Sequence, residues 1–130
     1  MLNKTQYWIE LADDDLITAK WLLKGNRLLY CAYACHQIIE KALKAAIAEN
    51  VGEVPPKIHD LPKLASKGLI YDLMSEEQLL ILDKLRPMQI EGRYPEYKEE
   101  IYQRLTTEYC EKMVEETEGL LCWIKQQLEK

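Results

Sequence analysis

The sequence predicts an all-α protein, an up-down four-helix bundle with one additional short helix, folded as a single domain over residues 1–130. Two observations support this prediction. Apolar residues recur at the 3.6-residue spacing of an α-helix in several long segments, and no segment shows the two-residue alternation of a β-strand. The chain is also 48% hydrophobic and 30% charged, which is typical of a globular domain with a buried core.

The first predicted helix covers about residues 3–24 and ends at a Gly-Asn pair, which is typical of a helix C-terminus. Its apolar face is expected to turn towards the core and consists of Trp8, Leu11, Ala12, Leu16, Ala19, Leu22 and Leu23. Asp15 lies within this face, where a carboxylate without a partner would be destabilising. We expect Asp15 either to form a structural ion pair or to belong to a site. The cations available for such a pair are Lys41, Lys44 and Arg93.

The second predicted helix covers about residues 27–50 and is apolar over most of its circumference. An ordinary surface helix buries a stripe of little more than about 100°. This helix has much more apolar surface to bury, so we predict that it is the central helix. A polar stripe nevertheless runs along one edge of it, formed by Gln37, Glu40, Lys41 and Lys44. The stripe is either a solvated edge held by a Glu40–Lys44 pair or the wall of a polar cleft.

Three further helices are predicted in the second half of the chain. Asp60 is a good N-cap for a short helix, and Ser75 with Gln78 forms a capping box for a fourth helix. Residues 86–104 contain two prolines and a glycine and are predicted to be the least regular region. The final helix covers about residues 106–129, where apolar residues recur at helical spacing.

The net charge excludes a broad basic surface. The formal charge is −5 and there is no basic run, so no DNA partner is expected, although a small local basic site is compatible with this balance. No segment approaches the roughly 20 apolar residues of a membrane span. The N-terminal segment MLNKTQYWIELADDD also lacks the apolar core of a signal peptide. We therefore expect a cytoplasmic protein without membrane association.

The four cysteines are predicted to be reduced core residues, because each lies in a helical pattern and none has Cys-x2-Cys spacing. They are Cys31, Cys35, Cys110 and Cys122. Cys31 and Cys35, even with the neighbouring His36, match no familiar zinc spacing. Neither a metal ion nor a cofactor is therefore expected.

Four segments occur in an order that is typical of one family. They are YWIELADDDLITAKWLL near the N-terminus, ACHQIIEKALKAAI in the second helix, PPKIHDL in the following connection, and RYP later in the chain. Together they resemble the HEPN domain family, specifically its small free-standing bacterial and archaeal members, over nearly the whole chain. The resemblance implies a four- or five-helix bundle that forms a homodimer. It also implies a small nucleotidyltransferase partner, as in toxin–antitoxin pairs.

The resemblance further implies nucleotide binding, and many family members are metal-independent RNases. Those RNases carry an Arg followed four to six residues later by a His, at a cleft formed by the dimer. The His moves the proton of the ribose 2′-hydroxyl, and the Arg neutralises the phosphate. In this sequence no histidine follows Arg93 at that spacing, and the only histidines are His36 and His59. The nuclease motif is absent, so RNase activity does not follow from the resemblance.

The polar stripe coincides with the Gln, Glu and Lys positions of the family, which favours the cleft interpretation. Arg93 and Tyr94 precede a proline whose turn could present them for phosphate contact and base stacking, or could pin two helices together. His59 is either part of a helix start or close to the cleft, and His36 is expected at the edge of the core. The candidate contacts for a nucleotide, RNA or phosphate are Asp15, Gln37, Glu40, Lys41, Lys44, His59, Arg93 and Tyr94.

Ile17 and Trp21 lie one turn apart on the outer side of the first helix and are interface candidates. The leading hypothesis is a HEPN-like nucleotide-binding and interaction module that works beside a nucleotidyltransferase. The alternatives are a diverged RNase in which Arg93 meets His59 or His36 across a fold or dimer contact, and a dimerisation scaffold without a ligand.

Overall fold

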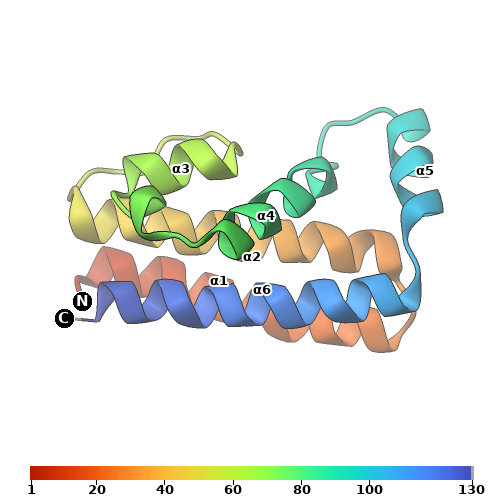
Figure 1. Ribbon diagram of the computed structural model, residues 1–130, viewed down its shortest axis with the longest axis horizontal. Helices are drawn as coiled ribbons and strands as arrows, with labels where there is room; N and C mark the ends of the chain where they lie inside the picture. Colours follow the sequence, from red (N-terminus) through yellow and green to blue (C-terminus); the bar gives the residue numbers. More distant parts are fainter. Residues whose placement is uncertain (130) are drawn as a thin grey trace.

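The computed structural model describes residues 1–129, which contain six α-helices, two 3-10 turns and no strand. Three long helices form the body of the bundle: α1 (Asn3–Lys24), α2 (Leu28–Asn50) and α6 (Thr107–Leu128). Figure 1 shows them side by side, with both ends of the chain at the same end of the bundle. The predicted all-α helical bundle is confirmed.

The second helix is central, as predicted. It packs against α1 and α6 and also against three shorter helices, which are α3 (Leu61–Lys67), α4 (Glu76–Leu85) and α5 (Pro95–Arg104). Of its 23 residues, 16 are buried. Because neighbours cover α2 on several sides, its apolar residues can occupy most of its circumference.

The first helix follows the prediction in its length but only partly in its buried face. Of the expected inward residues, only Ala12 and Ala19 are buried, whereas Trp8 and the leucines are half-buried. Thr5 and Ile9 are buried instead, which the sequence did not indicate. The helix stops at the predicted Gly-Asn pair, but Asn26, with φ of 58°, takes the left-handed conformation.

The helix starts of the second half are confirmed. The side chain of Asp60 accepts a hydrogen bond from the backbone N–H of Lys63 (3.1 Å), and Ser75 with Gln78 forms the capping box of α4. A 3-10 turn, η1 (Tyr71–Leu73), lies between α3 and α4. In Figure 1, α4 runs in the opposite direction to α2 and α6, which completes the up-down arrangement.

The region predicted to be irregular contains an additional helix. After a second 3-10 turn, η2 (Arg86–Met88), the chain turns at Gly92, whose φ is +75°, and enters α5. Pro95 is the first residue of α5, where a missing backbone N–H removes no helical hydrogen bond. Residues 1–129 thus contain six α-helices rather than the five that were predicted. As Figure 1 shows, α5 lies across the end of the bundle where α2 begins.

The cysteines are free, but they are not all core residues. Cys31, Cys35 and Cys110 are buried. Burial raises the pKa of the Cys110 thiol to about 11, whereas a side-chain hydrogen bond with Cys35, and burial after it, raise the pKa of the Cys31 thiol. Cys122 is exposed, because it falls outside the buried face of α6. Its assignment to the core was therefore wrong.

Candidate functional site

The polar stripe of α2 divides into two environments. Glu40 and Lys44 are buried, with 4% and 7% of their surface exposed. Gln37 and Lys41 are half-buried and line a groove between α1 and α2. One row of residues on a helix therefore contributes both to an internal cluster and to an open recess.

The internal part, the Glu40 cluster, consists of Glu40, Lys44, His36 and His59. One carboxylate oxygen of Glu40 accepts a hydrogen bond from the Lys44 ammonium (3.0 Å), and the other lies 2.8 Å from Nδ1 of His59. His36 Nδ1 is 3.7 Å from Glu40 Oε1 and has no hydrogen-bond partner among the described residues. The Lys44 ammonium also lies over the Trp8 ring, 5.7 Å from its centroid.

Burial determines the protonation state of His36. Only 1% of this residue is exposed, and desolvation lowers its pKa to about 4, although the nearby Glu40 carboxylate opposes the shift. His36 is therefore neutral at physiological pH. Half of the His59 side chain is exposed, so His59 is the histidine of the cluster that reaches solvent.

The open part, the α1–α2 groove, has a volume of about 590 Å³. Asp15 and Thr18 of α1 line one wall, and Tyr30, Tyr33, Gln37 and Lys41 of α2 line the other, with Arg27 at the end of the groove. Asp15 forms an ion pair with Lys41, one of the three cations available to it. The Nε2 atom of Gln37 is buried and has no hydrogen-bond partner within residues 1–129. The groove thus offers an ammonium, the half-buried Gln37 side chain and two phenol rings.

Tyr33 links the groove to the segment before α5. Its hydroxyl donates a hydrogen bond to the Glu91 carboxylate (2.9 Å). Burial, together with this carboxylate, raises the pKa of Tyr33 to about 12, so the phenol stays protonated. Tyr33 is therefore a fixed part of the wall rather than an acid or base.

Arg93 and Tyr94 lie apart from the α1–α2 groove. Both residues are exposed, with 81% of Tyr94 accessible, and neither lines the groove. The Arg93 guanidinium stacks over the Tyr97 ring, 5.0 Å from its centroid. The structure therefore brings Asp15, Gln37 and Lys41 together, and Glu40, Lys44 and His59 together, but it places Arg93 and Tyr94 outside both groups.

Ile17 and Trp21 lie on the outer face of α1, with 58% and 68% of their surface exposed. They line a shallow depression with Lys20 and Lys24, and the Lys24 ammonium lies 5.5 Å from the centroid of the Trp21 ring. The two interface candidates therefore form one small apolar patch between lysines.

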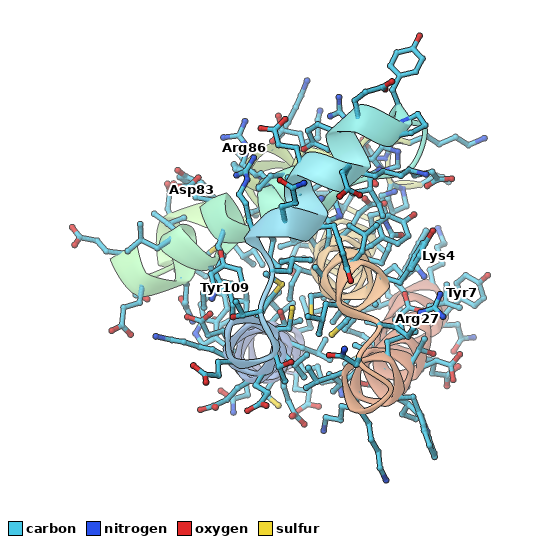
Figure 2. All side chains as sticks on the ribbon, turned by 90° about the vertical axis from the view of Figure 1, so that its right-hand side faces the viewer. Lys4, Tyr7, Arg27, Asp83, Arg86 and Tyr109 are labelled. Atoms are coloured by element: carbon cyan, nitrogen blue, oxygen red, sulfur yellow. The ribbon has the colours of Figure 1, made fainter. Side chains whose placement is uncertain are left out.

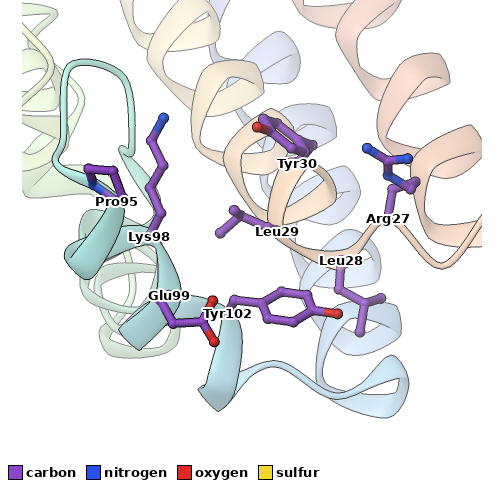
Figure 3. Close-up of a pocket in the computed structure, with 8 residues that line it drawn as sticks. All are labelled: Arg27, Leu28, Leu29, Tyr30, Pro95, Lys98, Glu99 and Tyr102. Atoms are coloured by element: carbon purple, nitrogen blue, oxygen red, sulfur yellow. The ribbon is translucent and has the colours of Figure 1, made fainter.

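A second recess, the α2–α5 pocket, was not predicted from the sequence. Its volume is about 410 Å³, and Figure 3 shows residues of α5 facing the first turn of α2 across it. The pocket is lined by Arg27, Leu28, Leu29, Tyr30, Lys98 and Tyr102, with Pro95 and Glu99 at its α5 side. The sequence does not indicate this pocket, because the pocket depends on α5, which was not predicted.

Among residues 1–129, no group of three or more His, Cys, Asp or Glu side chains is placed to hold a metal ion. In the same part of the chain, no helix is long and apolar enough to cross a membrane.

One of three comparisons with known proteins agrees with the resemblance drawn from the sequence motifs. No curated protein and no solved structure matches the chain. The family model described as HEPN domain matches residues 5–127, which includes every helix except the ends of α1 and α6. The chain therefore belongs to the HEPN domain family.

Proposed function

We propose that this HEPN protein is a nucleotide-binding and interaction module, and that it forms a homodimer and works with a nucleotidyltransferase protein in a pair of the toxin–antitoxin type. The α1–α2 groove is the observation that supports the proposal most. It lies on a helix that is otherwise covered by protein, and it combines a cation with hydrogen-bonding and aromatic groups.

The groups of the α1–α2 groove match the parts of a nucleotide. The Lys41 ammonium, held in place by Asp15, can contact a phosphate, and the unpaired Gln37 amide can complete its hydrogen bonding with a ligand. The rings of Tyr30 and Tyr33 offer faces on which a base can stack. The unpaired amide is informative, because a buried polar group without a partner is rare in a native protein.

Lys41→Glu is expected to weaken nucleotide binding by about tenfold or more, because a charge-assisted hydrogen bond to phosphate is replaced by repulsion. Titration calorimetry with AMP and ATP measures this effect. The thermal midpoint should change little, because the Lys41–Asp15 pair is partly exposed.

The matched control for Lys41→Glu is Lys125→Glu. Lys125 of α6 is also paired with an aspartate of α1, Asp13, but it lies outside the α1–α2 groove. The same reversal of charge there should leave the dissociation constant unchanged. Equal affinities of wild-type protein and Lys41→Glu would contradict nucleotide binding in the groove.

We propose that the nucleotidyltransferase contacts the patch formed by Ile17 and Trp21. An exposed tryptophan that lies beside a second apolar side chain has the character of an interface hot spot. Affinity capture from the native host should recover a nucleotidyltransferase with wild-type bait and lose it with Trp21→Glu. Leu80→Glu, which alters an equally exposed apolar residue of α4, should retain it. Repeated capture without any nucleotidyltransferase would contradict the pairing.

The RNase alternative draws its support from His59, a half-exposed imidazole whose Nδ1 is held by a buried carboxylate. Within residues 1–129 of one chain, however, no contact or recess brings Arg93 to either histidine, so a second chain would have to supply one of them. Cleavage of cellular RNA that is lost in Arg93→Ala would establish this alternative. Absence of cleavage above that variant would exclude it.

A further inference from the structure

The α2–α5 pocket contains charged groups that lie outside the α1–α2 groove. Three residues of α5 line the pocket but not the groove, namely Lys98, Glu99 and Tyr102. Only Arg27 and Tyr30 line both recesses. The volume of the pocket, about 410 Å³, lies within the range of about 300–1,000 Å³ that is usual for small-molecule sites. The pocket is therefore large enough for a ligand of its own.

One side of the α2–α5 pocket is cationic. Figure 3 shows the side chains of Arg27 and Lys98 on the same side of it, with the Tyr30 ring between them. Among the residues that the structure describes, neither cation takes part in an ion pair. Figure 2, which views the bundle from the end where α5 lies, places Arg27 well away from Asp83, the carboxylate that pairs with Arg86. Two cations without a protein partner on one wall suit the carboxylate of a ligand.

The opposite side of the α2–α5 pocket is acidic. Glu99 directly follows Lys98 in α5, and side chains of adjacent helical residues diverge by about 100°. Figure 3 accordingly shows the Glu99 carboxylate pointing away from the Lys98 ammonium, towards the side where Tyr102 lies. Glu99 accepts a hydrogen bond from the Gln103 amide (3.3 Å) and, within residues 1–129, forms no ion pair. This side of the pocket therefore suits an ammonium group.

An apolar floor separates the two charged sides. Leu28 and Leu29, in the first turn of α2, form this floor, and the Tyr102 ring of α5 reaches towards Leu28. Tyr30 and Tyr102 are 46% and 50% exposed, so both rings are accessible to a ligand. The pocket thus has the mostly apolar lining and the few placed polar groups that are typical of a small-molecule site. Its ligand should carry an acid and an amine at the two ends of an apolar body.

The two opposite charges of the pocket discriminate between classes of ligand. A nucleotide carries phosphate but no ammonium group, so it would bring negative charge close to Glu99 and leave this carboxylate unmatched. A single α-amino acid carries both charges on one carbon atom, whereas the pocket holds its charges on opposite sides. A short peptide with free termini carries its ammonium at one end and its carboxylate at the other, and each extended residue adds about 3.3–3.6 Å between them. Apolar side chains can then lie on the floor.

We propose that the α2–α5 pocket binds a short apolar peptide with free termini, of about two residues. Arg27 and Lys98 hold its carboxylate, and Glu99 holds its ammonium group. Its side chains lie against Leu29 and the Tyr102 ring. This inference goes beyond the proposed function and depends on none of its parts, because the charged groups of α5 lie outside the α1–α2 groove.

The test is titration calorimetry with the dipeptide leucyl-phenylalanine and with forms of it that lack one feature each. The N-acetylated form lacks the ammonium and the amidated form lacks the carboxylate. Each should bind wild-type protein about fivefold more weakly than the free dipeptide, the effect of losing one partly exposed charge pair. Glycyl-glycine, which keeps both termini but has no apolar side chain, should bind about tenfold or more weakly.

Two variants assign each charge of the dipeptide to its partner. Glu99→Gln should weaken binding of the free dipeptide about fivefold but leave the affinity of the N-acetylated form unchanged, because that form has no ammonium to lose. Lys98→Gln should likewise weaken binding of the free dipeptide about fivefold but not that of the amidated form. The matched control is Glu100→Gln, which alters the next carboxylate of α5 outside the pocket and should leave every affinity unchanged.

Three results would overturn the peptide site. They are no measurable binding of the free dipeptide to wild-type protein, equal losses for the free and N-acetylated dipeptides in Glu99→Gln, and AMP binding that is lost in Lys98→Gln, which would assign the pocket to nucleotides. The proposed function is tested separately by Lys41→Glu. Failure of that test would leave the peptide site standing, and failure of the dipeptide to bind would leave nucleotide binding in the α1–α2 groove standing.

Discussion

Replacing Glu40 with alanine is expected to lower the free energy of unfolding by about 3–5 kcal/mol. The change leaves the buried Lys44 ammonium without its carboxylate and removes the acceptor that lies against His59. A loss of this size is a large fraction of the roughly 5–15 kcal/mol that stabilises a typical domain. Urea unfolding followed by far-UV circular dichroism measures it.

The chain contains a matched control for this prediction. Glu100 and Arg104 form an ion pair with the same four-residue spacing as Glu40 and Lys44, but on the exposed face of α5. Glu100→Ala should change stability by no more than about 0.5 kcal/mol, because solvent screens an exposed pair. Equal effects of the two alanine substitutions would show that Glu40 is not buried in the folded protein.

A double variant separates the lost charge pair from the lost packing. Glu40→Leu combined with Lys44→Met removes both charges and keeps apolar volume in their place. Exchanging a buried ion pair for apolar side chains is often neutral or stabilising, so the double variant should recover most of the loss caused by Glu40→Ala. If the double variant is as unstable as Glu40→Ala, the loss of stability comes from the missing contacts of Glu40 with His36 and His59 rather than from the Glu40–Lys44 pair.

The fold could be predicted largely because its long helices carry their own signals. The apolar circumference of α2 predicts its central place, and the capping residues Asp60 and Ser75 mark two helix starts correctly. The helix α5 was missed because Ile101 is its only buried residue, so there is little apolar periodicity to detect. Pro95 was interpreted as an interruption, although at the first position of a helix it marks a start.

Within the candidate site, only features that depend on one helix could be predicted from the sequence. Helical spacing alone places Glu40 beside Lys44. The position of Asp15 on an apolar helix face indicates that this carboxylate needs a partner, and the structure pairs it with Lys41. The contact between Glu40 and His59 joins residues 19 positions apart, and the choice of Lys41 as the partner of Asp15 depends on how α1 packs on α2. Those contacts, and the α2–α5 pocket, depend on tertiary packing that spacing does not encode.

A second large effect is expected in the pH dependence of stability, because the ionisation of His36 is coupled to folding. In the folded protein burial lowers the pKa of His36 to about 4, against 6.5 for an ordinary histidine. The groups that face it are Glu40, His59 and Lys44. Between these two pKa values the unfolded chain binds a proton that the folded protein does not bind. Acid therefore favours the unfolded state.

The free energy of unfolding should accordingly be highest above pH 6.5 and fall as the pH drops from 6.5 towards 4, by about 3 kcal/mol in total. Urea unfolding at a series of pH values measures this slope. His36→Gln cannot titrate, so its stability should depend less on pH over the same interval.

Other groups titrate in the same interval, and the comparison with variants removes their contribution. Carboxylates protonate in both wild-type protein and His36→Gln, so the difference between the two curves isolates the histidine. Parallel curves for wild-type protein and His36→Gln would mean that His36 gains its proton in the folded state as readily as in the unfolded chain. The Glu40 cluster would then be open to water, and the distinction between an internal cluster and the α1–α2 groove would be lost.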